Sequence, residues 1–415
     1  MKNILILCDA FPPAFNPRMG YLCKYLPENG YNPIVISEQS NQRIFNNLSN
    51  IQNVNYINFY WNKNGSINKI KYILVFIADS LFNFKDLYFK HKAKRLIKDK
   101  NFSIILASVS WRAFPALVAK KLSKKYKIPF IVDCRDIYEQ FPNHEYTSKN
   151  FLKSTFVNKT IARIIQQKYK LQRNKILRSA NAITTISEWH KQHISQLNKN
   201  THLIFNGFDS ELFYFKPITS KTFRITYVGR IESFAVKDPT LLFESVDIMS
   251  KKNLINFKDF RLQFYLLNQT SKNLINKLSE KYNISEYVDI YDTVQNEEVP
   301  QILNESSILL LLANSAVGDN SPKGIMGTKI FEYIAVEKPI LCVRNDNSCI
   351  EQTIKNTKSG ISASSIEDVI EFITCKYKEW EKVGFTRQNV DKESIELFSR
   401  EYQATQFANL FDMYA

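Results

Sequence analysis

The chain has 415 residues, of which 44% are hydrophobic, and its formal net charge is +16. This length exceeds what one hydrophobic core usually serves, so we expect two domains, and the apolar content excludes a disordered chain. The first apolar run (3–8) is too short for a signal peptide and the longest one (72–84) is too short for a membrane span.

The charge is distributed unevenly along the chain. Residues 1–215 contain 32 Lys+Arg and 13 Asp+Glu, a net charge of +19, whereas residues 216–415 contain 24 and 27, a net charge of −3. The asymmetry predicts a domain boundary near 206–220 and an anionic partner for the first half, such as nucleic acid, a membrane surface or a phosphorylated substrate. The six cysteines show no CxxC spacing, so we expect them to be reduced and the protein to be cytoplasmic.

Short apolar runs alternate with helical patterns through the first half. Strands are predicted at 3–8, 33–37, 53–58, 103–107, 129–133, 182–186 and 202–205. Nearly continuous apolar strands of this kind indicate a parallel sheet that is covered on both faces. Residues 1–205 are therefore predicted to form one α/β domain.

The second half repeats the plan and is predicted to form a second α/β domain over 206–390. Strands are predicted at 224–228, 261–267, 287–291, 307–312, 339–343 and 360–362, and helices at 238–252, 271–283, 297–304, 327–336 and 366–381. An amphipathic helix at 391–413 is predicted to pack back on the first domain, as part of a terminal segment 391–415. The expected fold is two Rossmann-like, doubly wound parallel-sheet domains that face each other across a cleft.

Five of the ten glycines lie in three short segments near the predicted boundary or after strands of the second half. They are Gly207, Gly229, Gly318, Gly324 and Gly327. Glycine allows positive φ and a close approach of the backbone to a phosphate. This placement indicates a phosphate-containing ligand.

Basic residues follow the first strand of the second half. Gly229 permits a sharp exit from the strand, and Arg230 and Lys237 come after it. An arginine fork and a lysine charge that converge on one point suit a diphosphate. The alternative is that both are solvated surface charges.

A second glycine-containing loop precedes a predicted helix. Gly324 and Gly327 come before Thr328, and free N–H groups at such a helix start can bind an anion. Glu332 lies one turn into the helix, where its carboxylate could accept hydrogen bonds from a ribose diol. The alternative for Glu332 is a solvated or salt-bridged helix residue.

These segments, with several others, resemble those of the GT-B glycosyltransferases, in particular glycosyltransferase family 4. The resemblance covers most of the chain. It rests on FPP (11–13), VDCRDIYE (132–139), TTISEWHKQHI (184–194), FNGFDSELF (205–213), YVGRI (227–231) with KDP (237–239), and KIFEYIAVEKPI (329–340). The order and spacing of these segments are specific together, although no single one is decisive.

The resemblance implies retaining transfer of a sugar from a nucleotide-sugar donor, UDP- or GDP-linked, that binds the second domain. Arg230 and Lys237 would bind the diphosphate and stabilise the departing nucleotide. Glu332 would take the ribose hydroxyls, and Gly327 and Thr328 would offer backbone donors. Asn206 and Gly207 would lie at the hinge, facing the cleft.

No metal ion or other cofactor is expected beside the donor. The sequence contains no Asp-x-Asp, and Arg230 and Lys237 can supply the charge that a divalent cation would. The five histidines do not form a metal-ligand set.

Three departures from the family pattern bear on the site. Gly324 stands where the family often has its first glutamate, so the donor-sugar contact is open. Arg18 lies in a first loop that usually carries paired glycines, and it would bind a phosphate or lie in a solvated loop. Ser108, Ser110 and Trp111 occupy a stretch that often holds a histidine. Asp136 would then assist at the reacting centre, or be a structural carboxylate bonded to Arg135 or to backbone.

Basic and aromatic residues are interspersed in two stretches of the first half, 69–98 and 149–178, and the second contains nine Lys/Arg and no acidic residue. Such amphipathic helices suit an anionic inner leaflet. We therefore expect a peripheral enzyme on the inner face of the plasma membrane whose acceptor is a glycan, carried on a polyprenyl diphosphate. The family and the basic face suggest a bacterial capsule or O-antigen pathway. The alternative is a solvated basic face.

Three other functions compete with the transferase. A sugar-nucleotide epimerase uses the same twin domains but needs acid and base residues that are not evident. A nucleic-acid binder would explain the positive charge, but the sequence lacks zinc ligands and an RNA-binding aromatic signature, so we expect no nucleic-acid partner. A non-catalytic GT-B scaffold would explain Gly324.

Overall fold

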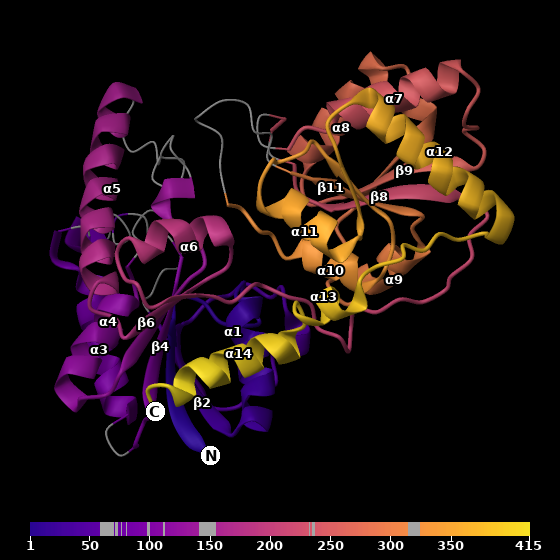
Figure 1. Ribbon diagram of the computed structural model, residues 1–415. Helices are drawn as coiled ribbons and strands as arrows, with labels where there is room; N and C mark the ends of the chain where they lie inside the picture. The colour runs from indigo at the N-terminus through magenta and orange to yellow at the C-terminus, as the bar shows by residue number, and fades with distance from the viewer. Residues whose placement is uncertain are drawn as a thin grey trace. The chain divides into compact units, whose positions relative to one another are not determined.

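A computed structural model describes residues 1–58, 70, 74–75, 77–79, 81–97, 100–110, 113–140, 155–231, 233–234, 237–313 and 324–415. The chain divides into two compact units (Figure 1). Unit 1 comprises Met1–Phe205 and Glu401–Ala415, and unit 2 comprises Asn206–Arg400. The last fifteen residues therefore belong to the same unit as the first strand.

Within its described residues, unit 1 contains a seven-stranded parallel sheet in the order β3-β2-β1-β4-β5-β6-β7. The strands are β1 (Lys2–Cys8), β2 (Tyr31–Glu38), β3 (Val54–Ile57), β4 (Ile104–Val109), β5 (Phe130–Cys134), β6 (Ala182–Thr185) and β7 (Thr201–Leu203). In the register, Ile4 lies opposite Pro33 of β2 and Ile104 of β4. The order reverses direction between β1 and β4.

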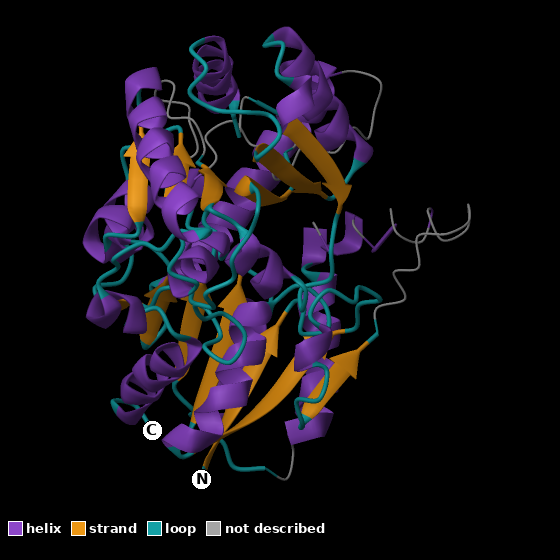
Figure 2. Cartoon of the chain, turned by 90° about the vertical axis from the view of Figure 1, so that its right-hand side faces the viewer, coloured by secondary structure: helices purple, strands orange, loops and turns teal. Residues whose placement is uncertain are grey.

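Helices cover both faces of this sheet (Figure 2) because alternate residues of each strand are apolar on opposite faces. Leu5 and Leu7 of β1 face a cluster that includes side chains of α3 (Phe84–Ile97), α4 (Ala116–Tyr126), α5 (Thr155–Leu177) and α6 (Glu188–Ser195). Ile4 and Ile6 face the other cluster, with α1 (Pro17–Tyr25) and α14 (Arg400–Asp412). The sheet is thus doubly wound.

Unit 2 contains a six-stranded parallel sheet in the order β10-β9-β8-β11-β12-β13, again counted over the described residues. The strands are β8 (Phe223–Gly229), β9 (Phe260–Leu266), β10 (Val288–Asp292), β11 (Ile308–Leu312), β12 (Ile340–Val343) and β13 (Gly360–Ala363). The helices are α7 (Thr240–Lys251), α8 (Gln269–Lys281), α9 (Val299–Glu305), α10 (Lys329–Ala335), α11 (Cys349–Thr357), α12 (Ile366–Val383) and α13 (Lys392–Glu396).

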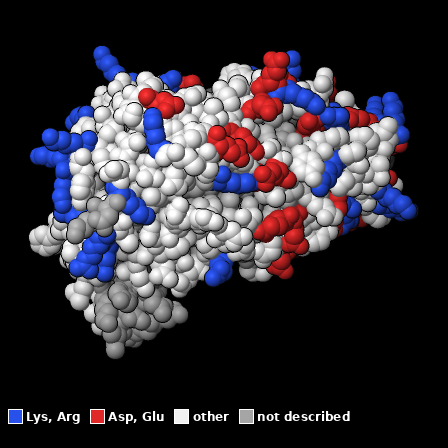
Figure 3. All heavy atoms as spheres, turned by 90° about the horizontal axis from the view of Figure 1, so that it is seen from below, with Lys and Arg blue, Asp and Glu red and all other residues white. Residues whose placement is uncertain are grey.

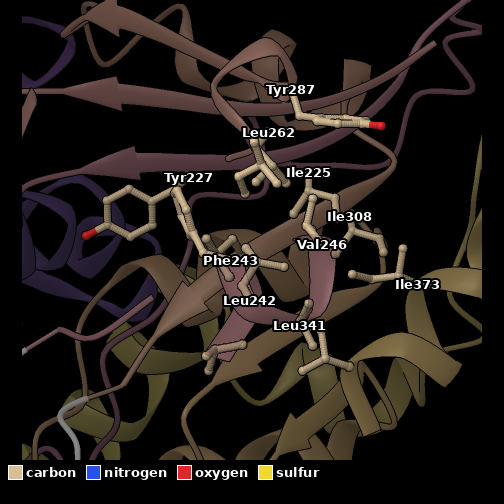
Figure 4. Packing of buried hydrophobic residues seen from close by; sticks show 14 of the residues in the cluster. Ile225, Tyr227, Leu242, Phe243, Val246, Leu262, Tyr287, Ile308, Leu341 and Ile373 are labelled. Carbon is tan, nitrogen blue, oxygen red and sulfur yellow. The ribbon is translucent and has the colours of Figure 1, made fainter. Parts of the chain in front are cut away.

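The core of unit 2 lies between its sheet and the helices α7, α8 and α12. Figure 4 shows Ile225 and Leu262 of the sheet against Val246 of α7 and Ile373 of α12. Tyr227 lies at the edge of this cluster, and its hydroxyl points away from the aliphatic side chains. The ring of Tyr227 therefore connects the core to the carboxyl end of β8.

The structure confirms the predicted α/β class and all thirteen predicted strands to within a few residues. It also corrects two helix predictions. Helix α11 was not predicted, and the single helix expected at 391–413 is two helices, α13 and α14. The break between them lies at Leu397–Ser399, where Ser399 forms a parallel bridge with Phe208. In the described part of the chain, no helix combines the length and the hydropathy of a membrane span.

Candidate functional site

The strand order places a switch point in each sheet, at β1/β4 in unit 1 and at β8/β11 in unit 2. In open α/β sheets, ligands bind outside the carboxyl ends of the strands at such a point. The residues after β8 and those of α10, which follows β11 in the chain, therefore define the candidate site of unit 2. The segment between β11 and Gly324, which includes Gly318, lies outside the described residues.

The loop after β8 brings Arg230 and Lys237 together. The Lys237 ammonium donates to the Arg230 carbonyl at 3.2 Å, and the Tyr227 hydroxyl donates to the same carbonyl at 3.0 Å. The Arg230 side chain is exposed, and that of Lys237 is half-buried. Arg230 and Lys237 thus both lie in the loop after β8, and their predicted convergence on a diphosphate stays a prediction.

Gly229 ends β8 in a backbone conformation, φ +147°, that favours glycine. A Cβ atom added there would lie 1.8 Å from the Nζ atom of Lys329. The glycine is therefore needed for both its backbone angle and the close approach of a lysine.

Lys329, the first residue of α10, was not predicted as a site residue. Its ammonium lies 4.7 Å from the centre of the Tyr227 ring. Burial, with repulsion from Lys237 and Arg230, lowers the pKa of Lys329 to about 7, and Glu332 opposes the shift. The signal available in the sequence was its position, three residues before Glu332 on the same helix.

Glu332 is half-buried on α10 rather than freely solvated. Burial raises the pKa of its carboxyl, and the positive charges of Lys329 and Arg400 oppose that shift. The carboxylate therefore lies within the field of two cations from different segments of unit 2. Its predicted contact with ribose stays a prediction.

The two described glycines of the loop before α10 differ in whether their position favours glycine. Gly324 is in the left-handed region, at φ +68°, which favours glycine at this position. Gly327 is exposed, and an added Cβ would meet nothing within 4 Å. Thr328 occupies the cap position of α10 without a side-chain capping bond. The predicted contacts of this loop with phosphate or sugar stay predictions.

Gly207 has a structural explanation. An added Cβ would lie 2.2 Å from the Phe398 carbonyl oxygen, which accepts a hydrogen bond from the N–H of Phe208. The chain passes too close to Phe398 for any larger residue. Asn206, its half-buried neighbour, opens unit 2.

In unit 1, Arg18 forms a buried ion pair with Asp133. The two side chains are 2% and 0% exposed, and the Nε and Nη2 atoms of Arg18 donate to the carboxylate at 3.1 and 2.9 Å. Arg18 also donates to the carbonyls of Ile204 and Phe205 at 2.9 and 2.8 Å, and Thr184 donates to Asp133 at 2.6 Å. The solvated loop considered for Arg18 is wrong, because its side chain is buried. Its predicted contact with a phosphate stays a prediction.

Asp136 follows β5 at the carboxyl edge of the same sheet, beside Arg135. Arg135 donates to Asn16 at 3.0 Å and to Asp9 at 3.2 Å, not to Asp136, so the ion pair considered for Asp136 is absent from the described residues. Burial raises the pKa of Asp136, Arg135 opposes the shift, and Asp9 adds to it. The predicted assistance of Asp136 at the reacting centre stays a prediction.

A metal centre is not evident in the part of the chain that the structure describes. Its residues contain no group of three or more His, Cys, Asp or Glu placed to hold a metal ion. The cations at the end of β8 and the start of α10 are the positive charges available there to a bound anion.

Two family models match the chain. The model of Glycosyltransferase Family 4 matches residues 18–212, and that of Glycosyl transferases group 1 matches residues 208–374. The first model ends, and the second begins, close to the division between units 1 and 2. A search of curated proteins finds no match.

Solved structures resemble the whole chain at low sequence identity. A sucrose-phosphate synthase from Thermosynechococcus elongatus is 13% identical, with a TM-score of 0.63 and coverage of 100% of this chain and 99% of that chain. A glycosyltransferase from Rickettsia africae is 14% identical, with a TM-score of 0.63 and coverage of 100% and 98%. The Anabaena protein HepE, in complex with UDP and glucose, is 13% identical, with a TM-score of 0.61 and complete coverage of both chains. These likenesses concern the fold.

Proposed function

The chain belongs to the GT-B glycosyltransferases of the family 4 type, and from this premise we propose that it transfers a sugar, with retention, from a nucleotide-sugar donor to a glycan acceptor. The observation that carries the proposal is the group of three cations and one carboxylate at the switch point of unit 2. The Lys237 ammonium donates to the Arg230 carbonyl, and Lys329 lies beside Gly229 at the end of β8. Such a group suits a diphosphate attached to a ribose.

The donor proposed is linked to UDP, with GDP as the second candidate. HepE, which shares the fold, was solved with UDP and glucose. In this chain, Arg230 and Lys237 would stabilise the charge that grows on the departing diphosphate, and Glu332 would accept from the ribose hydroxyls. Because these side chains bring their own positive charge, we propose that the reaction needs no divalent metal.

Nucleotide release from a panel of UDP-, GDP-, ADP- and CMP-sugars tests the donor proposal. We expect release from one member of the panel, unchanged by EDTA. Release that EDTA abolishes would overturn the metal independence and leave the transferase standing. A protein that neither releases nor is thermally stabilised by any nucleotide sugar would support the non-catalytic scaffold. The two matching models are both of glycosyltransferases, which favours the transferase over the epimerase.

The acceptor proposed is a glycan on a polyprenyl diphosphate, in the synthesis of a cell-surface polysaccharide. The support is the charge of unit 1, where lysine and arginine side chains gather on the left-hand part of the face in Figure 3. Helix α5 carries six Lys/Arg and no acidic residue. It also exposes Phe156, Ile164 and Leu171, at 78%, 66% and 60%, at spacings of about two turns and therefore on one side of the helix. An exposed apolar stripe with a basic surround suits an anionic lipid surface.

Vesicle flotation tests this surface. We expect the wild-type protein to float with vesicles that contain phosphatidylglycerol, and the Phe156→Ser/Ile164→Ser variant to float several-fold less, because two apolar side chains no longer enter the bilayer. Leu254→Ser, which removes an exposed leucine of unit 2, is the matched control. If the wild-type protein stays at the bottom of the gradient at low salt, this result would contradict binding to a membrane and favour a solvated basic face.

A further inference from the structure

The ammonium of Lys329 lies at the switch point of unit 2, where it forms no ion pair with any acidic residue that the structure describes. It lies beside the Cα atom of Gly229 and over the ring of Tyr227. Within the described residues it makes no hydrogen bond and no ion pair. A half-buried ammonium in this condition is costly unless a ligand supplies the negative charge.

The groups that face Lys329 come from three segments. Arg230 and Lys237, in the loop after β8, repel its positive charge, and Glu332, on its own helix, attracts it. Tyr227 of β8 contributes the face of its ring. Among the described residues, the charges that disfavour the protonated form of Lys329 outnumber the one that favours it, and a bound anion would add negative charge beside it.

We propose that Lys329 is a third cationic ligand of the donor's diphosphate, and that its amine takes up a proton from the solvent when the donor binds. The proposal rests on the proposed function and deepens it, because it assigns the residue and the proton that accompany donor binding. The proton adds to the Nζ atom, and no bond of the donor is broken in this step.

The field before and after binding explains why the proton moves. Since burial and the two neighbouring cations hold the pKa of Lys329 at about 7, the free amine is mostly neutral at pH 8. A bound diphosphate cancels the repulsion and favours the charged form, so the pKa rises. Donor binding is therefore expected to weaken as the pH rises above 7, because the proton that it requires becomes scarcer.

Titration calorimetry at pH 8 in two buffers of different ionisation enthalpy measures this proton directly. The probe is the member of the UDP-, GDP- and ADP-sugar panel that thermally stabilises the wild-type protein. The diphosphate of such a sugar is esterified at both ends and does not itself titrate near this pH. We expect an uptake approaching one proton in the wild type. In Lys329→Met we expect no uptake and affinity about 10–100-fold weaker, as for the loss of a charge-assisted hydrogen bond.

Two further variants test whether Lys329 binds the donor or only packs within the protein. Lys329→Arg stays charged at every pH used, so it is expected to keep more of the affinity and to take up no proton. Lys338→Met removes another buried lysine, one that lies over the rings of Phe215 and Phe385, and is expected to bind and to take up a proton as the wild type does.

The outcomes distinguish this inference from the proposed function. Wild-type binding without proton uptake, or unchanged affinity in Lys329→Met, overturns the role of Lys329 and leaves the transferase standing. If no nucleotide sugar binds the wild-type protein, both proposals fall. Should Lys329→Met fail to fold, the comparison of the wild type with Lys329→Arg still decides, because only the wild type is expected to take up a proton.

Discussion

The Lys237→Ala variant is expected to release nucleotide from its donor about 10²–10³-fold more slowly than the wild-type protein, with its fold intact. The Lys237 ammonium is held 3.2 Å from the Arg230 carbonyl, at the end of β8. As the bond between sugar and diphosphate breaks, negative charge grows on the departing phosphate. A positioned cation stabilises that charge more in the transition state than in the bound donor, so its removal lowers kcat.

Steady-state release kinetics that separate kcat from KM test this expectation. Lys251→Ala is the matched control, because that lysine is 68% exposed and forms an ion pair with Asp247 on α7. Glu332→Ala should instead act mainly on KM, since a ribose contact is made equally in the bound donor and in the transition state. Wild-type kcat in Lys237→Ala would remove this residue from the mechanism.

The Asp133→Ala variant is expected to lower the free energy of unfolding of unit 1 by about 3–5 kcal/mol. The carboxylate accepts from Arg18 and from Thr184, and both members of the ion pair are buried. Removing the carboxylate takes a buried acidic partner away from a guanidinium that is itself buried. The loss is therefore much larger than that of a surface ion pair.

Hydrogen exchange of the amides of β5 and β6 measures this loss in unit 1 alone, which matters because a chain of two domains does not unfold in a single two-state step. Asp247→Ala, which breaks the exposed pair with Lys251, should cost no more than about 1 kcal/mol in a corresponding measurement on α7. If Asp133→Ala lowers the free energy of unfolding by less than about 1 kcal/mol, the ion pair contributes little to the stability of unit 1.

The sequence predicted the strands because each apolar run and each break in it is a local signal. The helix break at Leu397–Ser399 had no such signal, because it depends on a bridge between Ser399 and Phe208, which are nearly half the chain apart. Helix α11 was missed although Cys349–Thr357 has apolar residues on one face. Its buried apolar positions, Ile350 and Ile354, are about one turn apart, a pattern too short to stand out from a loop.

The site was predictable where residues follow a strand and not where distant segments meet. Arg230 and Lys237 lie in one loop, so their spacing alone placed them together. The pairing of Arg18 with Asp133 joins residues 115 positions apart, and nothing near Arg18 indicates that it is buried. Lys329 was missed for a related reason, since its approach to Gly229 becomes visible only when α10 is packed on the sheet.

The place of α14 in unit 1 has a consequence for how the protein is made on the ribosome. Phe407 and Phe411 lie in the same apolar cluster as Ile4 and Ile6 of β1, which α1 also covers, so the cluster is complete only after α14 has been synthesised. All of unit 2 is synthesised before α14. Part of the apolar surface of unit 1 therefore stays exposed while unit 2 is made, and a chaperone that binds such surfaces can act on it during that time.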